Sequence, residues 1–192
     1  MSKIKNSDVV VIGAGPGGYA AAFRAADLGN QVTLIEKDPT LGGVCLNRGC
    51  IPSKALLHLS RVIHEAKSLE KSGVTFSKPE INLELIRNWK NSIVKKLNNG
   101  ISQLAKNRNI NVIHGDAKFI SDSELIINTL DGKQSLIFKY CIIATGSTPS
   151  SIKGFPNNPK IINSTGALNL KEIPKKILVI GGGYIGLEMG SV

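Results

Sequence analysis

Two cysteines separated by four residues are the most reactive feature of the sequence. Cys45 and Cys50 enclose the segment Cys45-Leu-Asn-Arg-Gly-Cys50. On a regular helix, positions five apart point about 140° away from each other, whereas a disulfide needs Cβ atoms about 4 Å apart. The pair can therefore bond only where the chain bends, and Gly49 gives the backbone that freedom. We predict a redox-active pair, with Cys50 at the N-terminal end of a helix whose dipole favours the thiolate.

Two other interpretations of this pair are a metal site and two unrelated buried thiols. The sequence has no further Cys or His at the spacing that a metal site with Cys45 and Cys50 would need, since the nearest histidine is His58. We therefore expect no metal. Lys54 follows Cys50 by four residues, on the same helical face, where its charge favours a thiolate or an anionic cofactor ring. In an intracellular chain, such a pair is more often redox-active than structural.

A glycine-rich turn lies between a strand pattern and a helix pattern near the start of the chain. Gly13-x-Gly15-x-x-Gly18 follows the apolar run 8–12, and Glu36 closes the next apolar run. The first glycine permits the turn, the second admits a pyrophosphate, and the third lets helix and strand pack closely. The helix N-terminus stabilises phosphates, and the acid can accept hydrogen bonds from a ribose. The motif predicts an adenine dinucleotide without separating NAD from FAD; the alternative is a turn that binds no ligand.

A second glycine motif, Gly181/Gly183/Gly186, follows the apolar run 177–180. A flavin exchanges electrons with both a dithiol and a nicotinamide, whereas a nicotinamide carries hydride and does not ordinarily exchange directly with a disulfide. The cysteine pair therefore predicts FAD at the first motif, and the second motif fits a separate nicotinamide nucleotide, NAD. Residues 177–192 are too few for a complete βαβ unit, so we expect the sequence to be a fragment of a longer chain.

The remaining pattern predicts the elements that position these residues. The first part of the chain has the order strand 8–12, helix 19–28, strand 31–35, turns 39–50 and helix 50–69. Steps of three and four residues between apolar positions then predict an amphipathic helix of about twenty-five residues with a solvated, Lys-rich opposite face. Its apolar positions are Ile86, Trp89, Ile93, Leu97, Ile101 and Leu104. We expect three or four strands in a meander over 111–138, and a separate buried strand over 140–144.

These elements predict an α/β fold with a Rossmann-like FAD-binding domain that contains a parallel sheet, helices and an inserted β-meander. We assign that domain to residues 1–148 and a connector to 149–176. The first strand and glycine turn of a truncated NAD-binding domain then occupy 177–192.

Composition excludes several classes of protein. The chain has 192 residues and a formal net charge of +10, from 24 Lys and Arg against 14 Asp and Glu. The lysines are scattered and aromatic residues make up 5%, so we expect no nucleic acid as the main ligand. No apolar run approaches the roughly 20 residues of a membrane helix, and the start leaves no room for a signal peptide. With three cysteines, too few for a secreted disulfide scaffold, we expect a soluble cytoplasmic protein.

The segment Gly42-Gly-Val-Cys-Leu-Asn-Arg-Gly-Cys-Ile-Pro-Ser-Lys54 resembles the active-site signature of the flavin disulfide reductases, most closely the dihydrolipoyl dehydrogenase family. The resemblance covers the whole chain, through the first glycine motif, Ala144-Thr-Gly-Ser147, and the second glycine motif with Glu188. Glutathione reductases usually carry Lys where Ser53 stands, soluble transhydrogenases lack the cysteine pair, and mercuric reductases usually add an N-terminal metal-binding module. Arg48 is a departure, because the family often has Val or Trp there.

The resemblance implies a role for each matching residue. Cys45 would exchange with the substrate dithiol, Cys50 would face the flavin as a thiolate, and Lys54 would lie near the flavin N5. The residues implied in cofactor binding are Gly13, Gly15, Gly18 and Glu36 at the adenosine half, Gly115 and Ala117 at the adenine, and Thr145 and Gly146 beside the flavin. We interpret Cys141 as inert core, and His58, His64 and His114 as packing or surface groups.

The implied reaction is oxidation of dihydrolipoamide to lipoamide, with electrons passing through the cysteine pair to FAD and then to NAD. The implied partners are a lipoyl domain of a 2-oxo acid dehydrogenase complex or of the glycine cleavage system, and a second subunit in a homodimer. In this family the catalytic base and the flavin ribityl contacts lie beyond residue 192, so we expect the chain alone to be inactive. The alternatives are a reductase of another disulfide or of mercuric ion, and a non-catalytic flavin-binding fragment.

Overall fold

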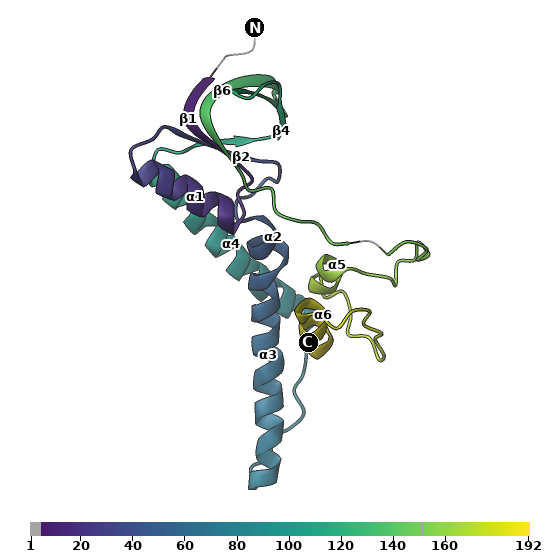
Figure 1. The fold of residues 1–192 in the computed structure, drawn as a ribbon. Coiled ribbons are helices and arrows are strands. Elements are labelled where there is room, and N and C mark those ends of the chain that lie inside the picture. The colour runs from purple at the N-terminus through teal and green to yellow at the C-terminus, as the bar shows by residue number, and fades with distance from the viewer. Residues whose placement is uncertain (1–4, 151) are drawn as a thin grey trace. The chain divides into compact units, whose positions relative to one another are not determined.

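The structure is a computed structural model that describes residues 5–150 and 152–192 (Figure 1). The chain divides into two compact units. The first contains the residues up to Leu46 together with Lys96–Ser147, and the second contains Asn47–Lys95 and Thr148–Val192. Within the described residues, no helix combines the length and apolar character that crossing a bilayer requires.

The first unit is built on a six-stranded mixed sheet with the order β3-β2-β1-β6-β5-β4. Its strands are β1 (Lys5–Ile12), β2 (Val32–Glu36), β3 (Asn111–His114), β4 (Asp116–Phe119), β5 (Glu124–Thr129) and β6 (Gly132–Ile143). β1 pairs in parallel with β2 and β6, and β2 pairs in parallel with β3. β4 and β5 continue the sheet in antiparallel pairing. The predicted α/β fold with a parallel sheet and an antiparallel insertion is confirmed.

Helix α1 (Pro16–Asp27) makes the crossover from β1 to β2 and packs against both strands (Figure 1). Pro16 stands in the first turn, where its missing N–H removes no helical hydrogen bond. The helix ends at Asp27 with Leu28 as its C-cap, and Gly29 follows with a left-handed φ of 86°, which favours glycine. The Gly29 and Asn30 amides then donate to the carbonyls of Ala26 and Ala25 at 2.9 and 3.2 Å.

Strand β6 differs from the prediction, which separated a meander from a buried strand at 140–144. β6 is one strand of 12 residues, and only β4, β5 and β6 form the meander, because β3 belongs to the parallel part. Its pairing with β5 ends at Ile137, whereas its pairing with β1 continues to Ile143. Among the described residues, positions 140–143 therefore have a strand neighbour on one side, and Tyr140 is 68% exposed. Apolar composition alone did not predict this exposure.

The core of the first unit lies where the parallel and antiparallel parts of the sheet meet. A cluster of buried apolar side chains comes from five strands: Val10, Ile35, Ile113, Leu125, Ile127, Leu136 and Phe138. Burial of each large aliphatic side chain contributes about 1.5–3 kcal/mol. This core fixes the strand ends that carry the first glycine motif and Glu36.

Helices dominate the rest of the chain. They are α2 (Gly43–Arg48), α3 (Cys50–Ser68), the 3₁₀ turn η1 (Leu69–Ser72), α4 (Leu83–Asn107), α5 (Ser164–Leu168) and α6 (Tyr184–Ser191). The predicted helices over 50–69 and 86–104 are confirmed. The turn-rich prediction for 39–50 was wrong in part, because helix α2 begins at Gly43. Gly42 and Gly43 have left-handed φ values of 103° and 59°.

Two further predictions were wrong. The polar face of α4 is not wholly solvated: Lys90 is 6% exposed, and its Nζ donates to the Leu168 carbonyl at 2.6 Å. Within the part of the chain that the structure describes, residues 177–180 form no strand, and Leu178 is 84% exposed. A strand needs a neighbour to satisfy its backbone groups, and no described strand pairs with this run.

Candidate functional site

The first glycine turn is closed by backbone contacts that leave no room for side chains. A Cβ atom on Gly13 would stand 2.3 Å from the Ala144 carbonyl oxygen, and one on Gly18 would stand 1.7 Å from the Gly13 carbonyl oxygen. Gly13 also has a left-handed φ of 98°. The turn is therefore packed between the end of β6 and the first turn of α1, which is the arrangement that a dinucleotide motif requires.

The N-terminus of α1 is chemically suited to a pyrophosphate. Gly15 caps the helix with φ −69° and ψ −178°, and no side chain among the described residues caps it. The first amide groups of a helix have no partners within the helix, and their dipoles favour an anion. The glycine turn and these amides together form a cradle that fits the phosphates of a dinucleotide.

The segment that carries the cysteines is anchored on this turn. The Gly42 amide donates to the Ala14 carbonyl at 2.8 Å, and a Cβ atom on Gly43 would stand 2.6 Å from the Gly15 Cα. Two glycine backbones thus meet without an intervening side chain. Cys45 follows Gly43 by two residues on α2 and is half-buried. The structure therefore brings the first cysteine to the predicted cofactor turn.

Glu36 lies at the carboxyl end of β2 and is 5% exposed. Its Oε2 accepts the Ala14 amide at 2.7 Å, and its Oε1 accepts the Asp38 amide at 2.9 Å. Each carboxylate oxygen can accept more than one hydrogen bond, so the group keeps capacity for a ribose diol. A buried carboxylate held by one amide of the glycine turn and one of the segment after β2 fits the adenosine side of FAD.

The other predicted adenine and flavin residues lie at the same edge of the sheet. Gly115 donates its amide to the Glu36 carbonyl at 2.9 Å, and a Cβ atom there would stand 2.6 Å from the Asn128 carbonyl oxygen. Ala117 follows in β4. Thr145 and Gly146 are exposed directly after β6. Ligands of open α/β sheets bind outside the carboxyl ends of the strands, which is where these residues converge.

Cys50 is the first residue of α3 and is exposed. Gly49 separates α2 from α3 with φ −145° and ψ −118°, so the predicted bend between the cysteines is present. At this helix start the dipole stabilises a negative sulfur. Whether the pair is a redox disulfide stays a prediction.

Lys54 lies in the next turn of α3 and forms an ion pair with Glu188 of α6. The Ser53 hydroxyl lies 3.2 Å from Glu188 Oε2 and 3.1 Å from the Cys50 carbonyl oxygen. The hydrogen bond from Lys54 holds the pKa of Glu188 below its usual value, and the same bond raises the pKa of Lys54. Sequence reasoning named both residues in separate motifs but missed their pairing across 134 positions.

The second glycine motif repeats the geometry of the first. Gly181 has a φ of 109°, and a Cβ atom on Gly186 would stand 2.3 Å from the Gly181 carbonyl oxygen. Gly183 caps α6 at φ −71° and ψ 168°, close to the values of Gly15. The second motif therefore has a tight glycine turn followed directly by a helix start, as the first motif has.

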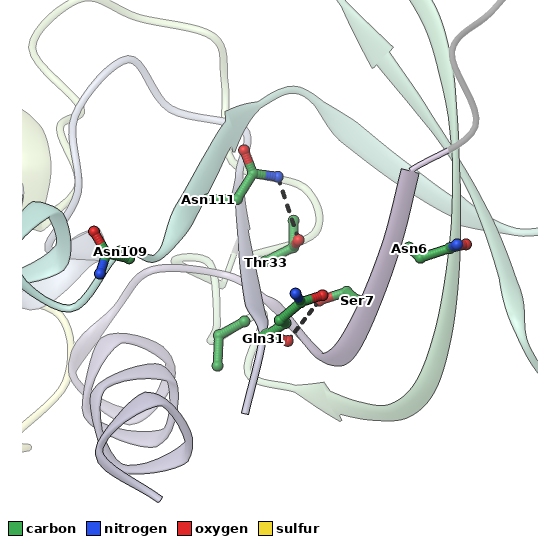
Figure 2. A pocket seen from close by; sticks show the side chains of 7 residues that line it. Asn6, Ser7, Gln31, Thr33, Asn109 and Asn111 are labelled. Atoms are coloured by element: carbon green, nitrogen blue, oxygen red, sulfur yellow. Dashed lines mark hydrogen bonds between the residues drawn. The ribbon is translucent and has the colours of Figure 1, made fainter. Parts of the chain in front are cut away.

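A surface pocket of about 450 Å³ lies at the opposite edge of the sheet (Figure 2). Its lining residues come from the amino ends of the parallel strands and from the segment before β3: Asn6, Ser7, Gln31, Val32, Thr33, Asn109 and Asn111. None of the predicted site residues belongs to this lining. The candidate site is therefore the carboxyl edge, with its glycine turn and acid.

Fold and site together have the features of a dinucleotide-binding redox protein. Residues 7–192 match the pyridine nucleotide-disulphide oxidoreductase family, and the chain belongs to this family. Its curated relatives include dihydrolipoyl dehydrogenases. That of Buchnera aphidicola subsp. Schizaphis graminum is 50% identical over 187 residues, which cover 97% of this chain and 39% of the relative. That of Vibrio parahaemolyticus is 49% identical over 194 residues, covering 100% and 41%.

A solved structure supports the same family. The copper(II) complex of a cysteine-to-serine variant of RclA, the HOCl-induced flavoprotein disulfide reductase of Escherichia coli, has a TM-score of 0.79 and 32% sequence identity. The similarity covers 96% of this chain and 39% of that chain. The chain thus spans about two fifths of the length of the curated relatives, at 39% and 41%.

Proposed function

We propose that the chain is the FAD-binding and dithiol-bearing part of an enzyme that oxidises dihydrolipoamide to lipoamide, with NAD as the final acceptor. The observation that carries the proposal is the contact of Gly43 with Gly15, because it joins the cysteine segment to the dinucleotide turn. The relatives named dihydrolipoyl dehydrogenase support the choice of substrate.

The cysteines exchange with the substrate by thiol–disulfide chemistry. A substrate thiolate attacks the Cys45 sulfur of the oxidised pair, and Cys50 leaves as a thiolate. The second substrate thiol then displaces Cys45, so that the substrate is oxidised by two electrons and the pair is reduced by two. The N-terminus of α3 stabilises the Cys50 thiolate, and Lys54, which is paired with Glu188, lies one turn away.

FAD, when bound, supplies the two-electron transfer from the reduced pair to a nicotinamide. The Gly13–Gly18 turn and the start of α1 would hold its pyrophosphate, and Glu36 would hold its adenosine ribose. Gly115 and Ala117 would approach the adenine by their backbone, and Thr145 and Gly146 would lie beside the flavin. The turn of Gly181, Gly183 and Gly186 would hold part of the NAD.

The proposal extends to the setting of the enzyme. Its substrate would be carried on a lipoyl domain of a 2-oxo acid dehydrogenase complex or of the glycine cleavage system. The working enzyme would be a homodimer in the cytoplasm, as the resemblance to the dihydrolipoyl dehydrogenase family implies. The resemblance to the family implies that the proton acceptor for the substrate thiols would come from outside these 192 residues.

A single-turnover experiment tests the proposed chemistry. The air-oxidised chain is mixed anaerobically with dihydrolipoamide, and lipoamide and protein thiols are counted. We expect one lipoamide and two new thiols for each chain, and none for Cys45→Ser. The Cys141→Ser variant is the matched control and should react like the unaltered chain. Reaction with glutathione at an equal rate would contradict the proposed substrate, and no reaction with either thiol would contradict a redox role for the pair.

A further inference from the structure

The side chain of His114 is linked to the segment that follows Glu36. His114 ends β3, and in the parallel register it stands opposite Glu36 of β2. Its Nδ1 lies 2.8 Å from the Asp38 carbonyl oxygen. A carbonyl oxygen can only accept a hydrogen bond, so this contact assigns the proton to Nδ1.

This bond is part of a network centred on the Glu36 carboxylate. The Asp38 residue donates its amide to Glu36 Oε1 at 2.9 Å and accepts from His114 through its carbonyl. Ala14 of the glycine turn donates to Glu36 Oε2 at 2.7 Å. The Gly115 amide, next to His114, donates to the Glu36 carbonyl at 2.9 Å. Asp38 is therefore held by the imidazole on its carbonyl side and by the carboxylate on its amide side.

The network has a consequence for the direction of the carboxylate. The amide bond to Glu36 Oε2 comes from the turn before α1, which the packing of Gly13 and Gly18 fixes. The other comes from Asp38, which lies in the segment after β2. The His114 bond holds the carbonyl of this same residue, and so helps to fix the amide that orients Glu36 Oε1.

We infer that His114 is a positioning residue for the adenosine half of the cofactor: its Nδ1–H holds the Asp38 peptide, and that peptide orients the Glu36 carboxylate toward the ribose. The inference rests on the proposed binding of FAD. The sequence alone classed His114 as a packing or surface group, because a histidine at a strand end has many structural roles. The hydrogen bond to the segment after Glu36 is what separates it from His58 and His64.

Three substitutions of His114 distinguish a positioning role, which needs the Nδ1–H donor, from a role that needs only the volume of the side chain. His114→Asn places an amide donor near the position of Nδ1 and should restore the bond to Asp38. His114→Gln keeps a donor but carries it one bond further, near the position of Nε2. His114→Leu keeps apolar volume and removes the donor. A merely structural histidine would tolerate Gln and Asn alike.

The test measures the Kd of the purified chain for FAD by quenching of flavin fluorescence, and for ADP by calorimetry. We expect His114→Leu and His114→Gln to raise both Kd values by roughly two- to tenfold, the size of one net hydrogen bond, with His114→Asn within twofold of the unaltered chain. Thermal unfolding of each variant, measured without ligand, checks that the fold is intact. Long-range ¹H–¹⁵N correlation spectra report the tautomer of the ring and should show the proton on Nδ1.

The outcomes separate this inference from the proposed function. Glu36→Ala serves as the reference for loss of the ribose contact. If Glu36→Ala weakens FAD binding while His114→Leu binds as tightly as the unaltered chain, the positioning role is wrong and FAD binding stands. The role is also wrong if His114→Asn is as weak as His114→Leu, or if the proton resides on Nε2. If the unaltered chain binds neither FAD nor ADP, the proposed cofactor site fails and the inference fails with it.

Discussion

Substitution of Gly18 by alanine tests the close packing of the first glycine turn. The added Cβ atom would stand 1.7 Å from the Gly13 carbonyl oxygen, whereas real Cβ contacts stay beyond 3.0 Å. Helix and turn must therefore separate by at least 1.3 Å (3.0 − 1.7). Because the obstacle is backbone and not a flexible side chain, we expect Gly18→Ala to lower the free energy of unfolding by about 1–3 kcal/mol, as overpacking does. The displaced amides should also weaken FAD binding.

Gly17 provides the matched control for this substitution, one position earlier in α1. Within the described chain, a Cβ atom on Gly17 would meet no heavy atom within 4 Å. Gly17→Ala should therefore be neutral or should stabilise the helix, by up to about 1 kcal/mol. Urea denaturation of both variants gives the two free energies, and flavin fluorescence gives the two Kd values. If Gly18→Ala proves as stable as Gly17→Ala, the close contact with Gly13 does not exist in solution.

Four other predictions concern the site and its supports. Glu36→Ala should weaken FAD binding by about 1.5–3 kcal/mol, the size of a charge-assisted hydrogen bond; unchanged flavin content after dialysis against a competing apoflavoprotein would exclude the ribose role. Thiol titration of the air-oxidised chain should give one thiol, and three after reduction; three before reduction would mean that Cys45 and Cys50 do not bond. Burial lowers the pKa of Lys90 below its ordinary 10.5, so Lys90 keeps its proton to a higher pH in the unfolded state than in the folded state. The free energy of unfolding should therefore rise with pH between the lowered pKa and 10.5. Urea denaturation of Lys90→Met should lack this rise. The chain supplied with FAD and NAD should form no NADH from dihydrolipoamide, since a positioned base typically contributes about 10²–10⁴-fold to the rate; substantial steady-state turnover would place the base within these residues.

The local part of the fold could be predicted from the sequence. The apolar run before Gly13, the glycine turn and the helix after it follow from contacts between near neighbours, and the structure has all three. The amphipathic helix α4 could be predicted from the steps of three and four residues between its apolar positions. The bend at Gly49 was also predictable, because a helix cannot bring Cys45 and Cys50 together without one.

The rest depends on contacts between distant segments. α2 is helical although Gly42 and Gly43 suggest a turn, because these glycines pack on the first glycine turn. Lys90 can be buried because the Leu168 carbonyl, 78 positions away, accepts a hydrogen bond from its ammonium group. Neither partner is visible in the local pattern. The pairing of Lys54 with Glu188 was missed for the same reason.

The pairing of β1 has a consequence for the synthesis of the chain. β1 is an inner strand, yet Val10 finds its β6 partner in Cys141, 131 positions later (141 − 10). At about 5–20 residues per second, a ribosome needs roughly 7–26 s to make that stretch. Throughout this interval, one edge of an apolar strand has no native neighbour and is open to pairing with other nascent chains. Recovery of folded protein from cells should therefore depend on translation rate and chaperone supply, independently of the stability of the finished sheet.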